Sequence, residues 1–426
     1  MRQPMNYSDL VRPDAVHGSV YTDPSIFQDE LQRIYAQEWI YVGHTSEIPN
    51  KGDYKRSTIG TQPVILCRDT DGDVQVLFNR CRHRAATVCQ EPCGNAQKFR
   101  CEYHGWTYEL NGKLTGIPYE DGYESIDKSQ FSLTKPSVID TYRGFVFACM
   151  RKPKISLLDS LGGPTREQID YFCDLSPEGE VLVQAGTVKL VYQGSWKLQM
   201  GNSIDGYHPN FTHQSFFKTI KRMTGVRMDN FNGSSIVCVR DLGQGNSVID
   251  SADFNAVPER KAHKLKALKR TQWGQKYYDD MVDAYGVERA EDVIVVGGTH
   301  MNVFPNLVTL GQQIRTIRPI AVDRTEVDLA PTLLKGVPDE LNTMRIRQFE
   351  QFYSPQGGGI HDDVEMFNRV QEGLACTMEP WLLFQRGLHR EVTLPDGSIK
   401  GQVTDETPQR AMWKHWLEVM ENNVDY

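Results

Sequence analysis

Two segments, Cys81-Arg82-His83 and Cys101-Glu102-Tyr103-His104-Gly105-Trp106, decide the fold of the first part of this chain. Each segment holds one cysteine and one histidine, as C-x-H in the first and C-x-x-H in the second, and seventeen residues separate them. From Trp39 to about Met150, short apolar runs alternate with turn signals such as Asn111-Gly112. This alternation predicts a small all-β domain that carries the two segments on its loops.

The residue types in the two segments indicate a metal centre. Two thiolates and two imidazoles on facing loops suit a [2Fe–2S] cluster of the Rieske type, in which two nitrogens replace two sulfurs on one iron. Neutral imidazoles lower the cluster's negative charge and raise its reduction potential, which suits a relay of single electrons. A Cys₂His₂ zinc site uses the same residue types but usually pairs C-x₂₋₄-C with H-x₃₋₅-H. The predicted cluster ligands are therefore Cys81, His83, Cys101 and His104.

Two further cysteines lie between these segments. The spacing of Cys89 and Cys93 matches no familiar iron–sulfur pattern, so we interpret them as structural or surface cysteines.

A second group of candidate ligands lies at Asn202-Ser203-Ile204-Asp205-Gly206-Tyr207-His208-Pro209-Asn210-Phe211-Thr212-His213. His208 and His213 are five positions apart, which on a regular helix would place them about 140° from each other. Pro209 prevents a regular helix here, because its ring clashes with the carbonyl four residues back. We therefore predict an interrupted helix that lets both imidazoles converge. A purely structural histidine pair is the alternative unless a third ligand exists.

A candidate third ligand follows the glycines at 357–359, where a helix is expected to begin. Asp362 with Glu365 three residues later fits an N-cap arrangement, which accounts for one of two neighbouring aspartates. Asp363 then remains as a free carboxylate. Two histidines and one carboxylate that leave open positions form the facial triad of non-haem Fe(II) oxygen chemistry.

Composition narrows the choice of partners. The 426 residues carry 47 Lys and Arg against 55 Asp and Glu, and the net charge of −8 argues against nucleic acid or an anionic membrane as the main partner. No apolar run approaches the roughly 18 residues that span a bilayer, and no signal-peptide core is visible near Met1. Nine scattered cysteines fit a reducing compartment. We expect a soluble cytoplasmic protein of two or three domains.

The rest of the chain has a mixed pattern. A helix start signal stands at Asp23-Pro24-Ser25, before the β-rich region. The basic run Lys261–Arg270 fits a solvated helix face, with a partner-docking patch as the alternative. Strand-like runs are predicted at 181–193 and 293–328, and helices at 258–285 and from 408 onward. The fold class is thus α+β, with an all-β domain at 39–153 inserted near the N-terminus of a second domain made of 1–38 and 154–426.

Over nearly its full length the chain resembles the α subunit of Rieske non-haem iron oxygenases, the aromatic-ring-hydroxylating family. The motif Asn-x-x-Asp-x-Tyr-His-x₄-His at 202–213 carries this resemblance. It implies that His208, His213 and Asp363 hold a mononuclear iron. It also implies that Asp205 links His208 to His104 of a neighbouring subunit. Gly201 departs from the family, because many relatives have an acidic or amide residue there.

The resemblance also implies a helix-grip catalytic domain around an antiparallel sheet, assembled as head-to-tail α trimers or as α₃β₃ with a small β subunit. Electrons from NAD(P)H would arrive through a reductase, with or without a ferredoxin. The implied activity is hydroxylation or cis-dihydroxylation of an aromatic ring with O₂. A Rieske electron carrier without oxygenase chemistry and a zinc-stabilised binding protein are the competing hypotheses.

The chain length and the stretch Asp362–Phe367 look more like the salicylate, anthranilate and benzoate-type members than the naphthalene type. An aromatic carboxylic acid is therefore the favoured substrate, with a polycyclic or other aromatic hydrocarbon as the alternative. Arg315 and Arg318 are candidates for holding a carboxylate, although salt-bridged structural arginines fit a strand equally well. The predicted pocket walls, for which core packing is an equal explanation, are Asn202, Phe211, Phe216, Phe217, Val303 and Phe304.

Overall fold

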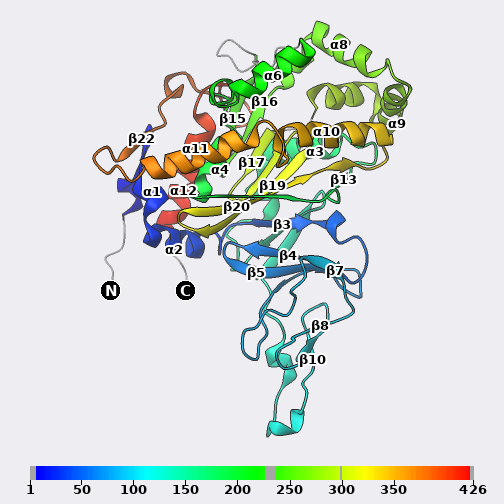
Figure 1. Cartoon of the computed structure of the whole chain (residues 1–426), viewed down its shortest axis with the longest axis vertical. Coiled ribbons are helices and arrows are strands. Elements are labelled where there is room, and N and C mark those ends of the chain that lie inside the picture. The colour runs from blue at the N-terminus through cyan, green and yellow to red at the C-terminus, as the bar shows by residue number, and fades with distance from the viewer. Residues whose placement is uncertain (1–5, 226–235, 298–299, 423–426) are drawn as a thin grey trace. The chain divides into compact units, whose positions relative to one another are not determined.

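The computed structural model describes residues 6–225, 236–297 and 300–422. The chain divides into two compact units, which we call the β unit (Tyr35–Leu157) and the α+β unit (Met1–Ile34 with Leu158–Tyr426). The α+β unit is therefore discontinuous in sequence, and the β unit is inserted after its first helical segment (Figure 1).

The β unit contains three antiparallel sheets. Their strand orders are β6-β5-β4-β7, β11-β12-β3 and β10-β9-β8. The strands are β3 (Ile40–His44), β4 (Asp53–Ile59), β5 (Gln62–Arg68), β6 (Val74–Phe78), β7 (Cys93–Asn95), β8 (Phe99–Arg100), β9 (Thr107–Tyr108), β10 (Leu114–Gly116), β11 (Val138–Tyr142) and β12 (Phe145–Cys149). The predicted all-β domain is confirmed.

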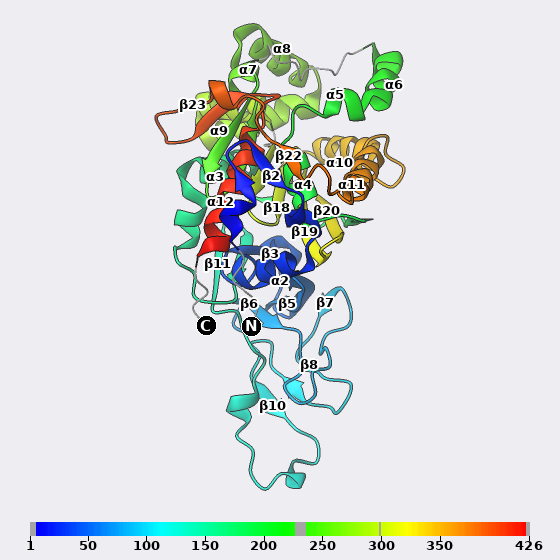
Figure 2. The same ribbon diagram turned by 90° about the vertical axis from the view of Figure 1, so that its left-hand side faces the viewer.

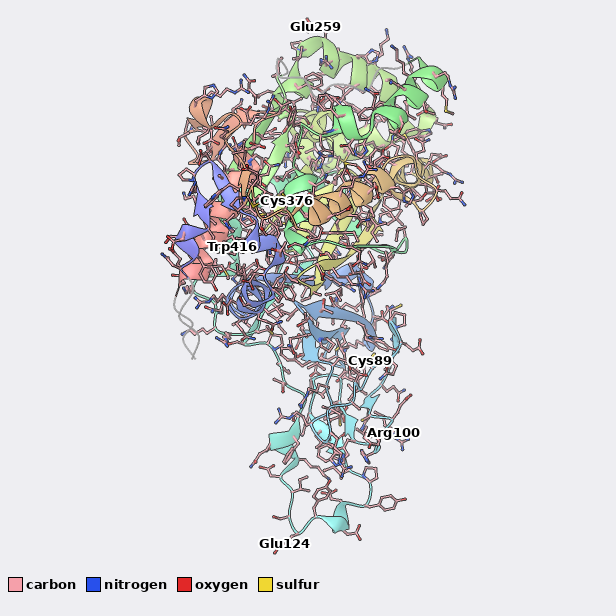
Figure 3. All side chains as sticks on the ribbon, turned by 60° about the vertical axis from the view of Figure 1, so that its left-hand side comes forward. Cys89, Arg100, Glu124, Glu259, Cys376 and Trp416 are labelled. Atoms are coloured by element: carbon pink, nitrogen blue, oxygen red, sulfur yellow. The ribbon has the colours of Figure 1, made fainter. Side chains whose placement is uncertain are left out.

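Local turn chemistry sets the strand pairing in the β unit. Asp69 Oδ1 accepts the backbone N–H groups of Asp71, Gly72 and Asp73 at 2.9–3.0 Å, and Gly72 has a φ of 100° that favours glycine. This turn joins β5 to β6. Within the unit, Figure 3 shows Cys89 toward the sheets and Glu124 at the tip of a long loop beyond β10.

The α+β unit is built on a nine-stranded antiparallel sheet of order β14-β20-β19-β18-β17-β16-β15-β24-β23. Its strands are β14 (Val188–Tyr192), β15 (Cys238–Gly243), β16 (Asn246–Asp250), β17 (His300–Val303), β18 (Leu307–Leu310), β19 (Gln313–Ala321), β20 (Arg324–Pro331), β23 (Val392–Thr393) and β24 (Ile399–Gln402). Five short strands pair outside this sheet, namely β1 (Val11–Arg12), β2 (Ala15–His17), β13 (Val181–Leu182), β21 (Leu333–Leu334) and β22 (Trp381–Leu383).

Helices pack against this sheet and against one another. They are α1 (Ser19–Thr22), α2 (Pro24–Arg33), α3 (Leu157–Cys173), α4 (Trp196–Ser203), α5 (Pro209–Thr212), α6 (Gln214–Thr224), α7 (Ala252–Ala256), α8 (Pro258–Leu268), α9 (Gln272–Val296), α10 (Asp339–Tyr353), α11 (Ile360–Gly373) and α12 (Thr407–Glu421). Helices α4, α10 and α11 contact β17, β20 and β14 respectively, whereas α7, α8 and α9 gather together at one end of the unit (Figures 1 and 2). Figure 3 shows Glu259 on α8 well away from Trp416 on α12. The α+β fold class is confirmed.

A buried charged group ties the N-terminal segment to the rest of the α+β unit. The carboxylate of Glu30 on α2 accepts hydrogen bonds from Lys197 Nζ at 2.6 Å, Trp196 Nε1 at 2.9 Å and Trp416 Nε1 at 2.8 Å. These donors come from α4 and α12, so three helices far apart in sequence meet on one carboxylate. The carboxylate and all three donors are buried, and an enclosed charge is tolerated only when it is paired and hydrogen-bonded in this way.

Most predicted helices are present, with one error at a boundary. Asp23 caps α2, because its Oδ1 accepts the N–H of Ser25 at 2.7 Å. The predicted strand-like run from Val293 is wrong at its start, since Val293–Val296 form the last turn of α9. A short apolar run fits a buried helix end as well as a strand. Within the part of the chain that the structure describes, no helix has the length and apolar character needed to cross a bilayer.

Candidate metal centres

The two cysteine-containing loops of the β unit have the same backbone pattern. In each, the cysteine N–H donates to the carbonyl five residues on, at 2.8 Å for both Cys81 and Cys101. The N–H four residues on donates back to the cysteine carbonyl, at 3.1 Å from Ala85 and 2.8 Å from Gly105. Ala85 and Gly105 occupy the left-handed region, with φ of 66° and 73°. Each loop therefore curls around its cysteine in the same way.

The predicted cluster ligands of the β unit lie together. The Nδ1 atoms of His83 and His104 are 3.1 Å apart, and the thiols of Cys81 and Cys101 contact each other. Both thiols are buried, and the ring of Trp106 stacks on His83 with 5° between the planes. Two nitrogens side by side and two sulfurs side by side are the donor set that a Rieske [2Fe–2S] cluster requires.

Hydrogen-bond donors surround the two sulfurs. Burial raises the pKa of the Cys101 thiol, while the backbone N–H groups of Tyr103 and His104 oppose this by donating to its sulfur. The hydroxyl of Tyr108 lies 3.2 Å from Cys81 Sγ. Such donors stabilise negative charge on cluster sulfurs and tune the reduction potential.

In the α+β unit, the helix that carries the two histidines is interrupted as predicted. Helix α4 ends at Ser203, α5 begins at Pro209 directly after His208, and His213 stands between α5 and α6. Because the proline cannot continue a helix from the preceding residues, the chain turns twice and brings the two imidazoles to the same side. The ring centroids of His208 and His213 are 5.4 Å apart.

Asp363 completes the group. Its Oδ1 lies 3.5 Å from His208 Nε2 and 3.2 Å from His213 Nε2, and the candidate ligand atoms all lie within 4.8 Å of one another. Burial alone would raise the pKa of Asp363 and lower that of His213. Their hydrogen bond outweighs burial, so the pKa of Asp363 is lowered and that of His213 is raised. Two imidazole nitrogens and one carboxylate oxygen in contact suit a divalent iron, which would take the place of the shared proton.

Asp362 does not have the role that its spacing suggested. The predicted N-cap arrangement with Glu365 is wrong, because α11 begins at Ile360 with Gly359 as its N-cap. The chain enters the helix earlier than expected, so Asp362 lies within the first turn. Its Oδ2 lies 3.4 Å from His213 Nδ1, where it can orient the imidazole. Neither the helix start nor this contact follows from the sequence pattern.

Asp205 lies beside the other histidine. Its Oδ2 is 3.4 Å from His208 Nδ1, and its Oδ1 accepts the N–H of Tyr207 at 2.6 Å. The second half of its predicted role, a link to His104 of a neighbouring subunit, concerns an assembly and stays a prediction. Asn202 also contacts the group, with its Nδ2 3.4 Å from His208 Nε2 and 3.3 Å from Asp363 Oδ1.

A cavity of about 450 Å³ adjoins the three candidate ligands. Of the predicted wall residues, Asn202, Phe216 and Phe217 line it. Phe211 does not, since its side chain is 70% exposed on α5. Val303 and Phe304 are buried elsewhere, in packing that places Phe304 against Trp196 and His415. The other lining residues are Ser203, Asp205, His208, Pro209, His213, Val237, Ile249, Ser251, Phe254, Asn255, His300, Leu310, Gly311, Arg315, Phe352, Tyr353 and Asp363.

The two arginines of β19 have different environments. Arg318 is ion-paired, with its guanidinium 2.7 Å from Asp328 and 3.5 Å from Glu326. Arg315 is buried, lines the cavity and lies with its guanidinium carbon 5.0 Å from the ring centroid of Tyr353. Among the described residues no carboxylate forms an ion pair with Arg315, and its Nε has no hydrogen-bond partner. Only the fold distinguishes the two, because both stand on one strand.

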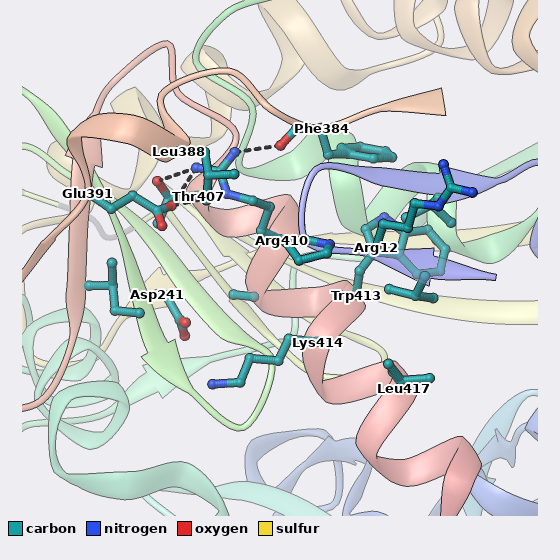
Figure 4. A pocket seen from close by; sticks show the side chains of 15 residues that line it. Arg12, Asp241, Phe384, Leu388, Glu391, Thr407, Arg410, Trp413, Lys414 and Leu417 are labelled. Atoms are coloured by element: carbon teal, nitrogen blue, oxygen red, sulfur yellow. Dashed lines mark hydrogen bonds and ion pairs between the residues drawn. The ribbon is translucent and has the colours of Figure 1, made fainter. Parts of the chain in front are cut away.

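A second cavity, of about 310 Å³, lies elsewhere in the α+β unit between β1, the loop at 384–391 and α12 (Figure 4). Its walls are largely apolar. The guanidinium of Arg410 is held by Glu391 and by the carbonyl of Phe384 at 2.6 Å, and Arg12 lies 3.6 Å over the ring of Trp381. These side chains are committed to the protein itself, and among the described residues no group of histidine, cysteine and carboxylate ligands adjoins this cavity.

Comparison with known proteins agrees with both centres. A family model described as the Rieske [2Fe–2S] domain matches residues 38–134, and one described as the ring hydroxylating alpha subunit catalytic domain matches residues 180–422. The chain is 31% identical over 450 residues to the 2-halobenzoate 1,2-dioxygenase large subunit of Burkholderia cepacia, a match that covers 98% of this chain and 93% of the relative. It is 32% identical to the anthranilate 1,2-dioxygenase large subunit of Acinetobacter baylyi, over 87% of this chain and 80% of the relative.

The fold also matches a solved naphthalene 1,2-dioxygenase variant bound to phenanthrene. The TM-score is 0.81 at 23% identity, with 98% of this chain and 96% of the other covered. The two family matches, in this order and over these ranges, imply a [2Fe–2S] cluster and a mononuclear iron. From its two donor groups and from these comparisons, the chain belongs to the family of Rieske ring-hydroxylating oxygenase α subunits.

Proposed function

We propose that this oxygenase acts on an aromatic carboxylic acid and that Arg315 holds the carboxylate. The observation that carries the proposal is the position of Arg315, a buried guanidinium that lines the same cavity as His208, His213 and Asp363. A buried cation without a carboxylate partner is costly, and a bound carboxylate would offset that cost with charge-assisted hydrogen bonds. The two curated relatives described above are named for benzoate and anthranilate substrates, which supports this choice over a hydrocarbon.

The residues that would hold the metals follow from the donor groups. Cys81, Cys101, His83 and His104 would hold the [2Fe–2S] cluster, and the triad of α5, α6 and α11 would hold the mononuclear iron. When bound, the cluster supplies single electrons and the iron supplies O₂ activation. Asp362 and Asp205 keep the Nδ1 sides of His213 and His208 in contact with a carboxylate, so that both Nε2 atoms point to the same place.

The cavity walls would fix the aromatic ring. Phe216, Phe217 and Phe352 provide apolar surface on the helix side, whereas Arg315 projects from the sheet side. A ring held by its carboxylate at one end and by aromatic edges along its faces can present only a limited set of carbons toward the triad. Positioning of this kind determines where oxygen enters the ring.

The redox partners complete the proposal. We infer that NAD(P)H is the electron source, through a reductase with or without a ferredoxin, and that the chain assembles as a homotrimer or with small β subunits. The description of both curated relatives as large subunits supports a multi-component enzyme.

Product analysis with the purified oxygenase and a surrogate reductase tests the proposal. The wild type should convert benzoate-type acids and should convert toluene poorly. Arg315→Gln should raise the KM for the acids by about tenfold to a hundredfold, because one charge-assisted contact is lost. Arg347→Gln serves as the matched control, since Arg347 is 73% exposed on α10. Equal conversion of acids by Arg315→Gln and wild type would reject the carboxylate assignment.

A further inference from the structure

His300 is a second polar side chain of the cavity, and the proposed function gives it no role. It is the first residue of β17 and lines the cavity beside Arg315. Its Nε2 atom is buried and has no hydrogen-bond partner among the described residues. Buried polar atoms are normally paired, so an unpaired one that faces a cavity marks a contact that a bound molecule can complete.

The protonation state of this imidazole follows from its other contact. His300 forms a hydrogen bond with the backbone of Ser203 that raises its pKa, as a bond from an imidazole N–H to a carbonyl does. Since Nε2 has no partner, that bond uses Nδ1. The Nδ1 atom therefore carries the proton, and Nε2 keeps a free lone pair.

The surroundings keep the ring neutral. The pKa of His300 is lowered to about 3, first by burial and then by the guanidinium of Arg315 and the imidazole of His208. At neutral pH, Nε2 is accordingly a hydrogen-bond acceptor and not a donor. It can pair with an O–H or N–H group, whereas a C–H bond or a halogen cannot satisfy it.

Sheet register places His300 and Arg315 on the same face. His300 pairs with Leu310 of β18, and Arg315 pairs with Val308 of the same strand. Leu310 and Val308 are two positions apart, so their side chains point the same way, as do those of their partners across the ladder. An acceptor and a cation thus stand about two strand spacings apart, roughly 10 Å between backbones, on one wall of the cavity.

We propose that His300 selects, among aromatic acids, those whose ring carries a hydrogen-bond donor, a hydroxyl or an amino group. This inference rests on the proposed function, because it takes Arg315 as the carboxylate anchor. With the carboxylate on Arg315, a ring O–H or N–H donates to Nε2 of His300. An amino group has two N–H bonds, so it can donate to a neighbouring carboxylate and to His300 at once, whereas a hydroxyl must choose one acceptor.

Ligand binding to the holoenzyme under anaerobic conditions tests the inference without turnover. Isothermal titration calorimetry would compare benzoate with the three hydroxybenzoate and three aminobenzoate isomers. In the wild type, at least one of these isomers should bind about tenfold tighter than benzoate, the value of one net hydrogen bond. His300→Phe should abolish that preference and leave the affinity for benzoate within about twofold. His300→Gln, whose amide oxygen accepts a hydrogen bond, should keep part of it.

Controls separate the possible failures. His263→Phe makes the same exchange at an exposed position of α8 and should keep the preference. Iron content and circular dichroism would verify that His300→Phe is folded and loaded. If no isomer binds tighter than benzoate, or if His300→Phe retains the preference, the role of His300 is wrong while the carboxylate anchor stands. If Arg315→Gln binds every acid as tightly as the wild type, the proposed function fails and the inference fails with it.

Discussion

The imidazole of His213 lies between two consecutive aspartates, with Asp363 3.2 Å from its Nε2 and Asp362 3.4 Å from its Nδ1. One carboxylate shares the position where a metal would bind, and the other holds the opposite side of the ring. Adjacent residues on a helix point about 100° apart, so both can reach one side chain only because His213 stands in the break between α5 and α6.

This arrangement makes Asp362 a positioning residue. Asp362→Asn should weaken iron binding at the triad by about tenfold to a hundredfold, because the amide orients the imidazole less strongly than a carboxylate. Iron retained after dialysis against graded chelator measures the effect. Glu365→Gln, at a half-exposed position one turn along α11, is the matched control. Identical chelator resistance in Asp362→Asn and wild type would show that the contact has no part in metal binding.

Asp205 is expected to matter for electron delivery and not for metal content. Asp205→Ala should keep both metals but lose turnover coupled to substrate, because its contact with His208 at 3.4 Å is removed. Iron analysis and the EPR spectrum of the reduced cluster would verify loading, and single-turnover oxidation of the pre-reduced enzyme would measure transfer. Full activity in this variant would contradict the bridging role.

The buried pair of Glu30 and Lys197 predicts a stability effect far from the metals. Lys197→Met should destabilise the α+β unit by about 3–5 kcal/mol, since it leaves a buried carboxylate without its cation. Adding Glu30→Gln to that variant should recover part of the loss. Urea unfolding followed by tryptophan fluorescence is suited to this, because Trp196 and Trp416 both donate to Glu30.

A surface pair provides the comparison. Lys189 is 58% exposed and pairs with Glu326 at 3.0 Å, so Lys189→Met should change the free energy of unfolding by less than about 1 kcal/mol. Similar losses in the two lysine variants would mean that the buried pair has no special weight.

The sequence was sufficient for features whose chemistry is local. C-x-H and C-x-x-H predicted the two loops of the β unit, and Pro209 predicted the helix break that brings His208 and His213 together. The role of Asp362 was missed because the glycines at 357–359 let α11 begin already at Ile360, which no capping rule foresees. His300 was missed because a lone histidine in a strand carries no periodic signal.

Long-range pairing accounts for the remaining differences. Arg315 and Arg318 look alike in sequence, and only the register of β19 with β20 places Asp328 and Glu326 beside the second of them. Phe211 was assigned to the cavity from its place in the motif, yet α5 directs its side chain outward. Such distinctions depend on partners that are distant in sequence or on the direction of one short helix.

The central claim, that this chain holds a [2Fe–2S] cluster and a separate mononuclear iron, is tested most directly by iron content in ligand variants. The fully loaded wild type should contain about three iron atoms per chain and show the absorption and EPR spectra of a Rieske cluster. His208→Ala with Asp363→Ala should fall to about two while keeping those spectra, and Cys101→Ala should lose them. A colourless wild type that contains zinc, or a double variant that retains all of its iron, would contradict the account.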